Sequence, residues 1–197
     1  MSSGAIRWGG LAAMLGGVLS VVSAVVIASM PRGCIGEECA FREMRDLGVA
    51  GALLMLALLL VMVGAAGLVI QARNAGRFGI LGKSGAILGA AGISLLVIGS
   101  VIQGILYEGD YPLMPFFVIP GVLVLVVGFS LLGIAVLLSR VLPRWAAVLL
   151  VAGSLAMLGF NDQNAQALMA IPFGIGWIAV GYSLWSGAPD QRPARVR

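Results

Sequence analysis

The stretch LGVAGALLMLALLLVMVGAAGLVI, residues 47 to 70, decides the fold because it holds no charged and no hydrogen-bonding side chain. An α-helix rises about 1.5 Å per residue, so roughly 20 apolar residues cross the roughly 30 Å hydrocarbon core of a bilayer. A stretch of this length and composition therefore predicts one transmembrane helix.

Similar apolar runs recur along the whole chain. The expected spans are residues 8–30, 47–70, 85–107, 116–138, 145–160 and 168–185. The chain is 60% hydrophobic and only 10% charged, with a mean hydropathy of +1.08, which excludes a water-soluble protein with a polar shell. We predict an all-α, polytopic transmembrane helical bundle of six spans in a single domain, residues 1–186. A basic cytoplasmic tail, residues 187–197, is expected to be disordered.

The fifth expected span, residues 145–160, is the shortest. It is followed by the polar run NDQNAQ, residues 161–166, which either caps the helix or lies in the membrane interface. A bundle of five spans is therefore the main alternative to six.

The distribution of basic residues predicts the orientation. With six spans and a cytoplasmic N-terminus, nine of the 12 basic residues fall inside, namely Arg7, Arg73, Arg77, Lys83, Arg140, Arg144, Arg192, Arg195 and Arg197. Short cytoplasmic loops are enriched in Lys and Arg in this way. Both termini are therefore expected in the cytoplasm, and the net charge of +4 reflects topology and anionic lipid rather than binding of nucleic acid.

Three segments that begin the first, third and fifth spans align without a gap. They are IRWGGLAAMLGG (6–17), GKSGAILGAAGI (82–93) and PRWAAVLLVAGS (143–154), each with a basic residue followed by small and aliphatic residues. The alignment predicts three helical hairpins. The alternative interpretation is that basic and aromatic residues simply anchor helices at the membrane interface. The expected anchors are Arg7, Trp8, Arg144, Trp145, Tyr182 and Trp185.

Small residues predict where helices pack. Gly85, Gly89, Gly92 and Gly99 fall on one stripe of the third span, and Gln103 continues it. In lipid, small residues that allow close backbone approach, and amides that bond between helices, drive association. The stripe predicts packing within the bundle, with packing against a membrane-protein partner or a second copy as the alternative.

A cavity is expected where prolines interrupt the spans. Pro120 and Pro172 each free a backbone carbonyl and favour a kink. With Gln103, Gly174 and Gly176 they are the residues expected to line a cavity between helices.

Residue types that support catalysis are scarce. The chain has no histidine, which excludes histidine-ligated zinc or haem. No charged residue falls in the middle of an expected span, although ion-coupled transporters almost always carry one there. We expect no metal and no cofactor, and no catalytic residue in the cytoplasmic segments.

The loop PRGCIGEECAFREMRD, residues 31–46, holds both cysteines. The predicted topology places it outside, where disulfides persist, so Cys34 and Cys39 are expected to form a structural disulfide. The alternative is a quinone-linked thiol oxidoreductase that uses the same pair. The C-x4-C spacing, the adjacent Glu37 and Glu38, and the lack of a second cysteine pair count against that alternative.

Two segments in the last third of the chain are similar to those of other membrane proteins. LPRWAAVLLVAGS (142–154) and GIGWIAVGYSLWSG (174–187) resemble the ends of small, uncharacterised six-helix bacterial inner-membrane proteins. The resemblance implies a six-helix fold in a bacterial inner membrane and no activity.

The function expected from the sequence is that of a structural or interaction protein of the membrane, which binds a lipid or another apolar ligand between its helices. Its expected partners are membrane lipids and either a membrane protein or further copies of the chain, and not nucleic acid. A transporter of a neutral or hydrophobic solute is the alternative of a different class.

Overall fold

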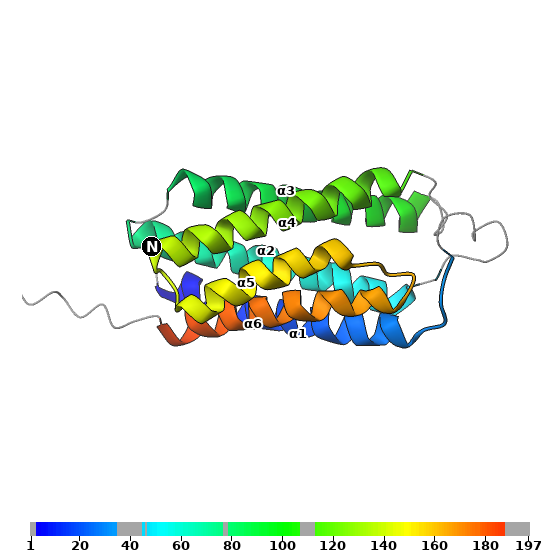
Figure 1. The fold of residues 1–197 in the computed structure, drawn as a ribbon, viewed down its shortest axis with the longest axis horizontal. Coiled ribbons are helices and arrows are strands. Elements are labelled where there is room, and N and C mark those ends of the chain that lie inside the picture. Colours follow the sequence, from blue (N-terminus) through cyan, green and yellow to red (C-terminus); the bar gives the residue numbers. More distant parts are fainter. Residues whose placement is uncertain (1–2, 35–44, 46, 77–78, 107–112, 188–197) are drawn as a thin grey trace, which may run out of the picture.

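A computed structural model describes residues 3–34, 45, 47–76, 79–106 and 113–187, which form an elongated helical bundle (Figure 1). No strand occurs in these segments. The α-helices are α1 (Ser3–Ser29), α2 (Gly48–Asn74), α3 (Ile80–Leu106), α4 (Pro115–Ser139), α5 (Arg144–Ala156) and α6 (Ala170–Gly187). Two 3-10 helices, η2 (Met157–Gly159) and η3 (Ala165–Met169), lie between α5 and α6.

Five of these helical segments are long and apolar enough to cross a membrane. They are Gly4–Ser29, Gly48–Asn74, Ile80–Gly104, Pro115–Ser139 and Ala165–Gly187. This confirms the prediction of a helical protein with several apolar membrane-spanning candidates. The fifth predicted span, residues 145–160, corresponds to α5 and η2, which end at Ala156 and Gly159. Their combined rise is only about 26 Å, and the pair is not among the five long segments.

Local sequence signals explain several helix boundaries. Pro115 occupies the first turn of α4, where a missing N–H costs no helical hydrogen bond. Arg140 ends α4 in the left-handed conformation with φ 53°, and Gly76 follows α2 with φ 66°. Pro172 lies just after η3 gives way to α6. Of the predicted tail, residues 187–197, Gly187 ends α6, and residues 188–197 lie outside the described residues.

Each helix runs antiparallel to the next and packs against more than one neighbour. α1 packs along both α2 and α6, α3 packs along α4, and α5 contacts α6 and α4. Figure 1 shows α3 and α4 together on one side of the bundle and α1 and α6 on the other. By comparison, α2 and α3 share few contacts.

Glycines allow these helices to approach with their backbones nearly touching. Between α1 and α6, a Cβ atom at Gly181 would lie 2.5 Å from the carbonyl oxygen of Gly10, and one at Gly174 would lie 2.5 Å from that of Gly17. Real Cβ atoms do not come so close. The two glycine pairs therefore set the distance between α1 and α6 in the way that small residues do in membrane bundles.

The bundle interior is centred on three aromatic rings. The Trp177 ring lies edge-on to Phe129, with centroids 4.9 Å apart, and 6.3 Å from Phe173. All three side chains are buried. They join α4 to α6 at the middle of the bundle, in the edge-to-face geometry that aromatic pairs prefer.

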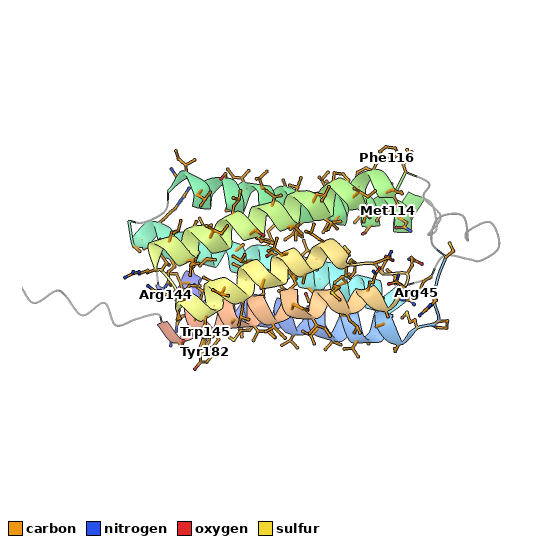
Figure 2. All side chains as sticks on the ribbon, viewed as in Figure 1. Arg45, Met114, Phe116, Arg144, Trp145 and Tyr182 are labelled. Atoms are coloured by element: carbon orange, nitrogen blue, oxygen red, sulfur yellow. The ribbon has the colours of Figure 1, made fainter. Side chains whose placement is uncertain are left out.

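The two ends of the bundle differ in charge. One end, called the basic end below, carries Arg7, Arg73, Lys83, Arg140 and Arg144, together with Ser3 and Gly187. The other, called the Cys34 end, carries Cys34, Arg45 and the connection from α5 to α6. Figure 2 shows Arg144, Trp145 and Tyr182 at the basic end and Arg45, Met114 and Phe116 at the Cys34 end.

Candidate functional site

An apolar cavity of about 340 Å³ lies between α2 and α3. Its volume falls within the range of small-molecule sites, about 300 to 1,000 Å³. The lining residues are Met62, Ala65, Ala66, Val69 and Ile70 of α2, Ala86, Ile87 and Ala90 of α3, and Phe129 of α4. None of these side chains carries a charge or a hydrogen-bonding group, so the cavity suits an apolar ligand.

Small side chains leave this space between the helices. Four of the lining residues offer only methyl groups, namely Ala65 and Ala66 on α2 and Ala86 and Ala90 on α3. The two helices share few contacts. Elsewhere in the bundle, glycines bring the helix backbones together. Between α2 and α3 alanines line an opening instead, with larger aliphatic side chains around it.

The cavity connects the membrane-facing surface to the core. At its mouth, Ala66 is exposed and Ile87 is 68% exposed. At its floor, Phe129 is fully buried, and its ring packs edge-on against Trp177. A ligand that enters from the lipid phase would therefore contact Phe129 directly and lie one ring away from Trp177.

The glycine stripe predicted for α3 faces α4. A Cβ at Gly85 or Gly92 would meet the backbone of α4, and one at Gly89 would lie 2.5 Å from the ring of Phe129. At Gly99 the nearest atoms belong to the side chain of Phe117, which also lies on α4. Gln103 is half-buried in the last turns of α3. The stripe thus lies inside the molecule.

The residues predicted to line a cavity are not brought together around this one. Gly174 packs against Gly17 of α1. Gly176 packs against α5, where a Cβ at Gly176 would lie 2.7 Å from the carbonyl oxygen of Leu149. Pro120 is half-buried on α4, and Pro172 is exposed on α6. Neither these residues nor Gln103 lines the space between α2 and α3.

Sequence reasoning missed every residue that lines the cavity. Prolines and glycines signal interrupted or tightly packed helices, whereas a cavity between straight helices needs small residues opposite one another without close backbone approach. The only available signal was four alanines, at positions 65, 66, 86 and 90, and alanine is too common in apolar helices to single them out.

A polar cluster around Arg45 closes the Cys34 end. It was not predicted from the sequence. The guanidinium of Arg45 donates to the carbonyl oxygens of Ile27 and Asp162 at 2.7 Å, of Pro31 at 2.9 Å and of Met30 at 3.0 Å. It therefore caps the C-terminal end of α1, where carbonyls lack helical partners and the helix dipole favours a cation. The same side chain ties α1 to the connection between α5 and α6.

Gln163 completes the cluster around Arg45. Its side-chain oxygen accepts from the backbone N–H of Arg45 at 2.9 Å, and its backbone oxygen accepts from the N–H of Gly33 at 3.0 Å. The polar run at residues 161–166 thus binds the loop after α1 through specific hydrogen bonds. In the sequence it could be read only as a cap or an interfacial segment.

Cys34 is 2% exposed next to this cluster. Cys39, the other half of the predicted disulfide, lies outside the described residues. No group of three or more potential metal-ligating side chains occurs within the described ranges.

The predicted interface anchors gather at the basic end. Trp8, Trp145, Tyr182 and Trp185 are all exposed there, and the guanidinium of Arg7 lies 5.4 Å from the centre of the Trp185 ring. This distance fits a cation–π contact. Exposed aromatic and basic residues at one level of the bundle are typical of a membrane interface.

Comparisons with protein-family models, with curated proteins and with solved structures gave no match.

Proposed function

We propose that this chain is a six-span membrane bundle that binds a lipid acyl chain in the cavity between α2 and α3. The observation that carries the proposal is the cavity itself, which is lined by apolar side chains, is exposed at its mouth and is closed at its floor by Phe129. In a membrane, the molecules that surround such an opening are lipids, whose chains match its lining in polarity.

The position of Trp177 provides a direct test of this proposal. In a variant with Trp8, Trp145 and Trp185 changed to phenylalanine, Trp177 is the only tryptophan. It is fully buried, so lipids around the protein reach it poorly. Lipids with brominated acyl chains, which quench tryptophan on close approach, are expected to quench Trp177 through the occupied cavity.

Filling the cavity should protect Trp177 from this quenching. The double change Ala86→Leu and Ala90→Leu replaces the empty space with side-chain atoms, so we expect brominated phosphatidylcholine to lose at least half of its quenching. The matched control is Ala152→Leu, the same change at an exposed position of α5 outside the cavity.

Stability measurements separate this result from misfolding. Filling a cavity with apolar atoms is expected to preserve or raise the unfolding temperature, because it adds packing contacts. If the double variant does not fold, Ala66→Phe at the exposed mouth serves instead. Undiminished quenching in a folded, filled variant would contradict acyl-chain binding in this cavity.

We also propose that the basic end faces the cytoplasm of a bacterial cell and that the protein resides in the inner membrane. The basic residues at that end and the positive-inside rule support this orientation. On this proposal Cys34 lies outside, and a structural disulfide to Cys39 is supported by the burial of Cys34 and by the oxidising compartment. Association with a membrane-protein partner or with further copies remains a prediction.

One labelling experiment tests both the orientation and the disulfide. Cys34 and Cys39 are the only cysteines, so a membrane-impermeant maleimide added to intact cells is expected to label the protein only after reduction. Labelling restricted to inside-out vesicles would contradict the orientation. Labelling without reductant would contradict a stable disulfide, and a redox state that follows quinone depletion would favour a thiol oxidoreductase.

A further inference from the structure

We propose that the lipid in the α2–α3 cavity is an anionic phospholipid whose phosphate is held by Lys83 and Arg73. This inference rests on the proposed function and adds the chemical class of the headgroup. It starts from the position of two cations relative to the lining residues on α2 and α3.

Each cation lies three or four residues along its helix from residues that line the cavity. On α2, Val69 and Ile70 line the cavity, and Arg73 comes three to four residues later, in the last turn. On α3, Ala86 and Ile87 line it, and Lys83 comes three to four residues earlier. Residues three or four apart share one face of a helix.

The antiparallel arrangement brings these two cations to the same end of the cavity. α2 runs toward the basic end and α3 runs away from it, so Arg73 and Lys83 both lie about one helical turn beyond the cavity on its basic side. Both are exposed. An apolar cavity that ends below two cations matches a molecule with an apolar chain and an anionic head.

The position of Lys83 on α3 is compatible with a bound anion. It lies in the first turn of α3, which begins at Ile80. The positive end of the helix dipole makes a cation unfavourable there and a bound anion favourable. A phosphate next to Lys83 would compensate this unfavourable position, and Arg73 would supply a second positive charge.

The cavity lining distinguishes a lipid from a free anion. A free phosphate or a nucleotide would find no hydrogen-bonding side chain among the lining residues and would interact with the two cations alone. A phospholipid in the leaflet at the basic end can place its headgroup at Lys83 and Arg73 while one acyl chain fills the cavity down to Phe129. We therefore assign the site to a lipid of that leaflet.

The test compares two brominated lipids with identical acyl chains, phosphatidylglycerol and phosphatidylcholine, on the full-length protein with Trp177 as its only tryptophan. Each basic residue near a membrane surface contributes about a fivefold preference for anionic lipid. With two such residues, we expect half-maximal quenching of Trp177 at a roughly 25-fold lower fraction of phosphatidylglycerol than of phosphatidylcholine. This difference should shrink as salt is raised.

Charge-neutral variants locate the headgroup. Lys83→Gln and Arg73→Gln are each expected to reduce the preference for phosphatidylglycerol about fivefold. Quenching by phosphatidylcholine should weaken less, because its choline ammonium offsets the charge of its phosphate. Arg144→Gln is the matched control, because it removes an exposed cation from the same end of the bundle at the start of α5.

The outcomes separate the two proposals. Equal quenching by both lipids, or a preference that Lys83→Gln and Arg73→Gln leave intact, would overturn the headgroup assignment and leave acyl-chain binding in place. An equal loss in Arg144→Gln would indicate general attraction of anionic lipid and would also overturn it. Absence of quenching by either lipid would overturn the proposed function itself.

Discussion

Changing Gly92 to leucine is expected to separate α3 from α4 and to lower the unfolding temperature of the detergent-solubilised protein by roughly 10 °C. A Cβ at this position would lie 2.7 Å from both the carbonyl oxygen of Gly121 and the Cα of Leu125, and closer still to the backbone nitrogen of Leu125. Backbone atoms cannot rotate away as a side chain can. The cost should therefore reach or exceed the upper part of the usual range for overpacking, about 1–3 kcal/mol.

The matched control is Gly104→Leu on the same helix. Among the described residues, no atom outside the immediate backbone lies within 4 Å of a Cβ at Gly104, so leucine there should leave the unfolding temperature within a few degrees of the native value. Circular dichroism at increasing temperature measures both variants. Similar unfolding temperatures for Gly92→Leu and Gly104→Leu would show that the close contact between α3 and α4 does not stabilise the bundle.

Changing Arg45 to alanine is expected to release the loop after α1 from the connection between α5 and α6. The change removes four charge-assisted hydrogen bonds to carbonyl oxygens and leaves the end of α1 uncapped. Because the cluster is partly buried, we expect a loss of roughly 2–4 kcal/mol of stability. Hydrogen exchange should show faster exchange at the end of α1 and in residues 160–165.

Two further variants define what Arg45 contributes. Arg45→Lys keeps the charge but loses the planar fork that reaches several carbonyls at once, so it should recover only part of the stability. Arg32→Ala removes an exposed cation close by and should change stability by less than about 0.5 kcal/mol. Full recovery by lysine would show that charge alone, rather than the hydrogen-bond geometry, holds this end together.

The helical membrane architecture could be predicted because hydropathy and length depend on the bilayer rather than on tertiary contacts. Residues 47–70 predict α2 almost completely for that reason. The polar run at residues 161–166 indicated that the fifth span is short, and α5 does end at Ala156. The beginning of α3 at Ile80 was missed by five residues, from the expected Gly85, because Lys83 suggested a helix end where the side chain is in fact exposed inside the first turn.

The candidate site could not be predicted because it depends on where two helices lie relative to each other. Ala86 and Ala90 are unremarkable within an apolar helix, and only the position of α2 relative to α3 makes them line a cavity. Arg45 presents the same problem over a longer distance, since its partner Asp162 is 117 residues away in the chain. Neither relation leaves a periodic pattern in the sequence.

The short α5 has a consequence for the bilayer around the protein. Figure 1 shows α5 ending before the neighbouring helices reach the Cys34 end. The polar residues 161–163, which follow, are hydrogen-bonded to Arg45 and to one another. A polar segment at this depth favours water and headgroups over acyl chains, and the bilayer adapts to a short apolar element by becoming thinner. We therefore expect lipid beside α5 to be compressed on the Cys34 side, which would give the protein a preferred membrane thickness.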